Sequence, residues 1–132
     1  MYRKNYKVKG EDVDDFMVMQ DVAYHNYTSS LLNAFLLEKG YSKRKREMLK
    51  IDLQESIESL IFRKHLMFTQ VFFVNLELLD VDYKEWKLTF RNRFFNANNE
   101  LCVTANTKLY WFDNAQQEII KPPKKIIDRL LN

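Results

Sequence analysis

The chain has little of the material that marks several large classes of protein. Its 132 residues include one cysteine, Cys102, and only two glycines and two prolines. A single cysteine excludes an internal disulfide framework and is typical of a reducing compartment. No apolar run is long enough for a membrane span, and the N-terminus lacks the apolar core of a signal peptide. We therefore expect a cytoplasmic protein with long regular elements, few tight turns and no membrane span.

The side chains of metal and nucleophile chemistry are also scarce. The two histidines, His25 and His65, have no second ligand at metal spacing, so we expect no metal site. Ser29 and Ser30 lack the flanking glycines of a nucleophile elbow. No glycine-rich loop is present to hold a nucleotide. The sequence therefore predicts no cofactor.

What the chain does contain is apolar and aromatic material. Hydrophobic residues make up 46% and aromatic residues 14%, which indicates one well-filled domain over residues 1–132. The net charge is only +3, but a basic run over residues 43–46 follows Gly40, a typical helix stop. This run is most simply a solvated loop, with a phosphate site and a nucleic-acid patch as alternatives. Because the aromatic residues occupy strand-alternating positions, they indicate a core, and we expect no nucleic-acid partner.

Periodicity predicts the elements of the fold. Alternation predicts a strand over residues 2–8, and spacing of three and four residues predicts a helix through residues 22–35. Alternation predicts further strands at 71–79, 86–94 and 101–111, and a short helix is expected over 124–131, after Pro122 and Pro123. The segment 54–66 fits either a helix or a strand. One long helix with an antiparallel meander is an α+β arrangement, with the helix lying across a curved sheet.

A group of carboxylates lies where the first strand leads into the helix. Asp12 and Asp14 precede an apolar stretch, and Asp21 stands near the start of the helical pattern. The free N–H groups of a helix's first turn stabilise negative charge, so an acid beside them is a plausible hydrolytic site. The alternative is that these residues only cap a turn and a helix N-terminus, the more frequent role of aspartate there.

The segment from Asp12 to Tyr24 resembles the first motif of the hotdog-fold acyl-CoA thioesterases of the 4-hydroxybenzoyl-CoA thioesterase type. The order of elements fits this family from Tyr2 to Asp113. The resemblance implies a hotdog fold, in which a curved antiparallel sheet wraps a long central helix and a short C-terminal helix follows. It also favours a strand for 54–66.

The resemblance implies a role for each residue of the motif. Asp14 is the catalytic residue, either activating a water or attacking the acyl carbon. The backbone at the helix start, Met17 and Val18, holds the oxyanion, and Met17 stands where the family usually has glycine. The implied substrate-binding positions are Gln20, Asp21 and Tyr24 on the motif, with Lys43 and Arg44 for the phosphates of coenzyme A.

The implied function is hydrolysis of an acyl-CoA thioester to free acid and CoA, with coenzyme A entering only as part of the substrate. The alternative is a non-catalytic acyl-CoA-binding or interaction module, which the loss of the motif glycine at Met17 favours. A homodimer or homotetramer is expected, because one helix covers one face of the sheet while 71–79 is apolar on both. The resemblance likewise implies an active site shared between subunits.

Overall fold

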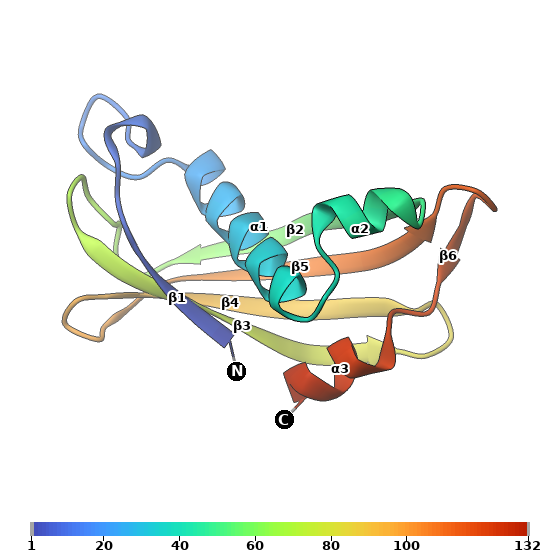
Figure 1. Cartoon of the computed structure of the whole chain (residues 1–132). Helices are drawn as coiled ribbons and strands as arrows, with labels where there is room; N and C mark the ends of the chain where they lie inside the picture. Colours follow the sequence, from blue (N-terminus) through green and yellow to red (C-terminus); the bar gives the residue numbers. More distant parts are fainter. Residues whose placement is uncertain (1, 132) are drawn as a thin grey trace.

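The computed structural model describes residues 2–131, with side-chain surroundings through residue 128, as a curved antiparallel sheet that carries helices on one side (Figure 1). In chain order the elements are β1 (Tyr2–Lys7), the short 3-10 turn η1 (Gly10–Asp12), α1 (Asp21–Glu38), α2 (Lys43–Met48), β2 (Ile51–Phe62), β3 (Val71–Asp82), β4 (Lys87–Asn96), β5 (Leu101–Asp113), β6 (Glu118–Ile120) and α3 (Lys124–Leu131).

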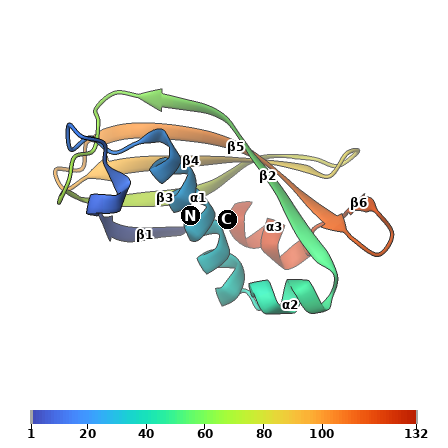
Figure 2. The ribbon, with the colours of Figure 1, turned by 90° about the horizontal axis from the view of Figure 1, so that it is seen from above.

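The strands pair in the order β1-β3-β4-β5-β2, and the short β6 pairs with β5. Every pairing is antiparallel, with Tyr6 opposite Phe72 and Leu53 opposite Trp111. Seen from above, the sheet curls around α1, and all three helices lie on its inner side (Figure 2). The twelve-residue β2 forms one edge of the sheet. No helix of residues 2–131 has the length and apolar character needed to cross a membrane.

The core forms where the buried side of α1 meets the inner face of the sheet. On β3 the alternate residues Phe72, Val74 and Leu76 are buried, as a strand with one inner face requires. Tyr24 of α1 packs edge-on against Phe94 of β4, with ring centroids 5.1 Å apart. Because α1 is fixed in this way, the loop before it is placed at one end of the sheet.

The outer face of β3 differs from the expectation. Phe73 stacks on Phe95, and Glu77 forms ion pairs with Arg91 and Arg93, so this face is covered by neighbouring side chains of β4. Val71 and Leu79, at the two ends of this segment, remain exposed, so the outer face of 71–79 is apolar in part rather than throughout. Within the described chain, the unpaired side of a strand lies instead at β2 and at β1, the two ends of the strand order.

Two segments between α1 and β3 refine the sequence prediction. The basic run is not a loop but the start of α2, where the Ser42 hydroxyl accepts a hydrogen bond from the Lys45 N–H at 3.1 Å and caps the helix. The ambiguous segment 54–66 is a strand, as the family layout favoured, although β2 begins and ends earlier. The predicted strands at 71–79, 86–94 and 101–111 and the C-terminal helix are confirmed, while β6 was not predicted.

Candidate active site

The motif residues form a small hairpin between η1 and α1. Val13 and Met19 are bridge partners, and the Asp14 N–H donates to the Val18 carbonyl oxygen at 2.9 Å. At its tip the Met17 N–H donates to the Asp14 carbonyl oxygen at 3.0 Å, and Met17 adopts a left-handed backbone with φ of 65°. The Met19 N–H also donates to the Leu66 carbonyl oxygen at 2.8 Å. The hairpin is thus tied to the segment that leads into β3.

Asp14 has a local role in this hairpin. Its Oδ1 accepts hydrogen bonds from the N–H groups of Phe16 at 2.8 Å and Val18 at 3.1 Å, so the carboxylate closes the turn. The side chain is exposed, and no hydrogen bond of the described residues reaches its Oδ2. The capping alternative therefore describes one oxygen of Asp14, while the other is left without such a bond in an exposed side chain.

The prediction that Met17 and Val18 stand at the helix start is wrong. Helix α1 begins at Asp21, and the N–H groups of Met17 and Val18 already donate to Asp14. Among the hydrogen bonds of residues 2–131, none uses the N–H of Asp21 or of Val22. These first-turn groups carry the positive end of the helix dipole and are the donors available to an oxyanion.

The three predicted substrate-binding residues of the motif lie in different surroundings. Gln20 is exposed and its amide donates to the Val13 carbonyl oxygen at 2.9 Å, and Asp21 is exposed in the first turn of α1. Tyr24 is fully buried at 0% exposure, and its hydroxyl accepts a hydrogen bond from the Leu66 N–H at 3.3 Å. Burial raises the pKa of Tyr24 to about 12. The placement of Tyr24 on a ligand surface is therefore wrong, because it belongs to the core.

A pairing of Asp12 with Tyr27 was not anticipated from the sequence. The Tyr27 hydroxyl donates to Asp12 Oδ2 at 2.5 Å, and the Lys9 N–H donates to the same oxygen at 2.9 Å. Burial, together with the hydrogen bond and charge of Asp12, raises the pKa of Tyr27. This carboxylate thus stabilises the turn and fixes it to α1. The pair borders a cavity of about 310 Å³, which is lined by Lys9, Glu11, Asp12, Val22, Ala23, Asn26, Tyr27 and Ser30.

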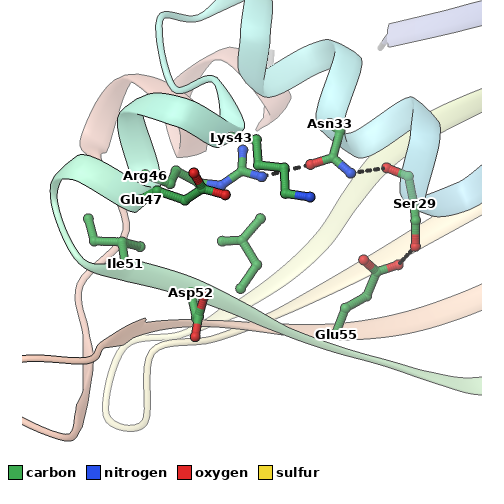
Figure 3. A pocket seen from close by; sticks show the side chains of 9 residues that line it. Ser29, Asn33, Lys43, Arg46, Glu47, Ile51, Asp52 and Glu55 are labelled. Carbon is green, nitrogen blue, oxygen red and sulfur yellow. Dashed lines mark hydrogen bonds between the residues drawn. The ribbon is translucent and has the colours of Figure 1, made fainter.

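The two basic residues assigned to phosphate binding separate in the structure. Lys43 lines a cavity of about 240 Å³ between α1, α2 and β2, whereas Arg44 is exposed and is not part of its lining (Figure 3). The same cavity contains Arg46, whose side chain is buried. Sequence reasoning missed this arginine because a basic run gives no sign of which member turns inward. Among the described residues, no group of three or more His, Cys, Asp or Glu side chains is placed to hold a metal ion.

Comparison with known proteins identifies the class. The family model described as the thioesterase-like superfamily matches residues 8–130, so the chain belongs to this superfamily. A search of curated proteins found no match.

Several solved structures share the fold over almost the whole chain. A hypothetical protein from Staphylococcus aureus in complex with CoA has a TM-score of 0.87 at 22% identity, covering 98% of this chain and 83% of that chain. A hypothetical protein from Aquifex aeolicus has a TM-score of 0.85 at 22% identity, covering 98% of this chain and 99% of that chain. A 1,4-dihydroxy-2-naphthoyl-CoA thioesterase from Synechocystis has a TM-score of 0.83 at 13% identity, covering 98% of this chain and 94% of that chain. These likenesses confirm the curved antiparallel sheet with helices that the hotdog resemblance implied.

Proposed function

We propose that the protein hydrolyses acyl-CoA thioesters and that Asp14 supplies the reacting carboxylate. The observation that carries the proposal is the exposed side chain of Asp14, held in a hydrogen-bonded hairpin that precedes, along the chain, the free N–H groups of Asp21 and Val22. Membership of the thioesterase-like superfamily and the CoA bound to the Staphylococcus aureus relative support this choice of substrate class.

The chemistry needs a carboxylate and a stabilised oxyanion. In one route Asp14 takes a proton from water, and the resulting hydroxide attacks the acyl carbon. In the other, an Asp14 oxygen attacks the acyl carbon, the carbon–sulfur bond breaks and CoA leaves as the thiolate, after which water hydrolyses the mixed anhydride. Either route develops negative charge on the thioester oxygen, which the first-turn N–H groups of α1 would stabilise.

Apolar side chains around the hairpin suit an acyl group. Phe16 is 83% exposed and Met17 is 51% exposed, and both flank the turn that Asp14 closes. Phe68 is a third exposed apolar residue, and its N–H donates to the Met17 carbonyl oxygen at 2.9 Å. Flexible and aromatic side chains of this kind accept fatty or aromatic acyl groups.

The active site is proposed to be completed by a second copy of the chain. The long edge strand β2 has a free side within the described residues, and long exposed edges are places where chains pair. A two-fold dimer through this edge, with or without further pairing into a tetramer, is consistent with the shared site that the family resemblance implies.

One observation favours the alternative of a non-catalytic acyl-CoA-binding module. The N–H of Met17, at the position where the family usually has glycine, is occupied by the Asp14 carbonyl oxygen. If no other donor replaces it, the chain binds acyl-CoA without turning it over.

The decisive test is Asp14→Asn, assayed by thiol release from a panel of acyl-CoAs. Asparagine keeps the Oδ1 acceptor for Phe16 and Val18 but loses the charge, so we expect unchanged unfolding and a loss of turnover of about 100-fold or more. Asp12→Asn is the matched control, because Asp12 is bonded to Tyr27 and should affect stability more than turnover. Near-normal turnover by the Asp14→Asn variant contradicts the assignment. Saturable CoA binding by the wild-type protein without thiol release supports the non-catalytic module.

A further inference from the structure

The cavity of about 310 Å³ beside the Asp12–Tyr27 pair has a polar lining that the proposed hydrolysis does not use. One wall comes from the segment 9–12, which includes η1, and the other comes from residues 22–30 of α1. Asp14 is not among the lining residues. Asn26 and Ser30 both line the cavity and stand four positions apart, so they share one face of the helix.

The carboxylate of Asp12 is held rigidly at this cavity by one of its two oxygens. Its Oδ2 accepts hydrogen bonds from the Tyr27 hydroxyl at 2.5 Å and from the Lys9 N–H at 2.9 Å. Tyr27 is only 6% exposed, so this anchor belongs to the core. No hydrogen bond of the described residues reaches Oδ1 of Asp12. A carboxylate accepts through both oxygens, so Oδ1 is available to a ligand.

The charges of the lining leave an excess of one negative charge. Lys9 and Glu11 neutralise each other, because the Lys9 ammonium lies 3.2 Å from Glu11 Oε1. None of the ion pairs formed by the described residues includes Asp12. Burial raises the pKa of Tyr27, and the hydrogen bond and charge of Asp12 and the charge of Glu11 raise it further. The potential at this hydroxyl is therefore negative, and the cavity favours a cation over an anion.

The unused acceptors of the lining match one kind of cation. No hydrogen bond of the described residues uses the side chain of Asn26 or of Ser30. Together with Asp12 Oδ1 they offer three oxygen acceptors, one of them charged. A primary ammonium has three donors and no acceptor, so it satisfies all three oxygens without leaving a donor unpaired. Val22 and Ala23 line the same cavity and supply an apolar wall for a short alkyl stem.

We propose that this cavity binds a primary amine in its ammonium form. Asp12, Asn26 and Ser30 are its ligands, and the alkyl stem lies against Val22 and Ala23. The site is separate from Asp14 and does not depend on the proposed hydrolysis.

The test is an NMR titration of the isotope-labelled full chain with n-butylammonium, 1-butanol and butyrate, three probes of equal length that differ in their polar end. We expect n-butylammonium to shift the amide signals of residues 9–12 and 22–30 with millimolar affinity, as suits a ligand of this size. The alcohol and the carboxylate should leave these signals unchanged. Asp12→Asn should weaken n-butylammonium binding about tenfold, because the charge of the acceptor is lost.

Substitutions at Asn26 test the sign of the charge in both directions. Asn26→Asp adds a second carboxylate and should tighten n-butylammonium binding roughly two- to fivefold, whereas Asn26→Lys brings its own ammonium and should abolish it. His25→Asp and His25→Lys are the matched controls, because His25 is the neighbouring residue on α1, is exposed and lies outside the lining. At physiological ionic strength these controls should bind as the wild type does.

The outcomes are decisive in either direction. Equal binding of 1-butanol, tighter binding of butyrate, or no shift with any probe at tens of millimolar overturns the proposal. Equal effects at Asn26 and His25 also overturn it. If Asp12→Asn does not fold, the comparison of Asn26→Asp with Asn26→Lys decides the question. The Asp14→Asn variant should bind n-butylammonium as the wild type does, so a failure of hydrolysis and a failure of this site are distinguishable.

Discussion

The left-handed backbone at Met17 makes a quantitative prediction about the hairpin. With φ at 65°, the Cβ of Met17 crowds its own backbone, a strain of about 1–2 kcal/mol for a residue other than glycine. Glycine removes this strain, but its greater conformational freedom in the unfolded chain lowers the stability of the folded state by about 0.4–1 kcal/mol. Met17→Gly also removes a side chain that is half exposed, so its comparison with the wild type mixes packing and backbone effects.

Met17→Ala separates the two effects, because alanine removes the same packing but keeps the strained Cβ. We expect Met17→Gly to be more stable than Met17→Ala by about 1 kcal/mol in urea unfolding, or about 3 °C in Tm. The control pair is Val22→Gly and Val22→Ala in the first turn of α1, where Val22 is 60% exposed. There the order should reverse, with alanine ahead by about 1 kcal/mol.

The reversal between the two positions is the informative result. If alanine is the more stable substitution at both Met17 and Val22, the turn does not have the left-handed geometry and the reasoning is refuted. The same Met17→Gly variant also bears on activity. Under the proposed function it opens the space beside Asp14, so turnover of bulky acyl-CoAs should rise, whereas unchanged turnover places the acyl group elsewhere.

Two further predictions concern β2. Burial raises the pKa of Glu55, so the folded state disfavours its ionised form and wild-type stability should fall as pH rises through that raised pKa. Glu55→Gln should remove this pH dependence of stability and leave Tm at pH 7 equal to that of the wild type or higher. The exposed control Glu58→Gln should keep the pH dependence of the wild type. A steeper loss of stability with rising pH in Glu55→Gln than in the wild type contradicts the assignment. Light scattering at micromolar concentration should show a dimer, with concentration-dependent protection of β2 amides from hydrogen exchange. A stable monomer refutes both the dimer and the shared site.

Regular periodicity made most of the sheet predictable from sequence. In β3 the apolar residues Phe72, Val74 and Leu76 recur every second position, and the structure buries all three. The outer face of the same strand was predicted only in part: Val71 and Leu79 are exposed apolar residues, but Phe73 and Glu77 contact partners on β4 that only the strand register reveals. Alternation along a strand predicts which of its residues face the core, but it does not predict which side chains of the neighbouring strands lie on its outer face.

The parts that sequence did not predict depend on contacts between distant segments. The family resemblance placed Met17 and Val18 at the helix start, whereas residues 13–19 form a hairpin, which is held by Leu66 and Phe68 about fifty positions later. Likewise α2 has no apolar periodicity, since its buried residue is Arg46, whose acceptor Asn33 lies on another helix. Patterns along one segment cannot show a partner on another.

The two interpretations of Asp14 that the sequence left open are compatible in the structure. One oxygen closes the hairpin through Phe16 and Val18, and no hydrogen bond of the described residues reaches the other in this exposed side chain. Loss of the whole carboxyl group in Asp14→Ala therefore removes a turn cap, at about 1 kcal/mol, as well as any catalytic charge. Only Asp14→Asn keeps the acceptor and removes the charge. A variant pair in which alanine loses stability and activity while asparagine loses activity alone assigns one role to each oxygen.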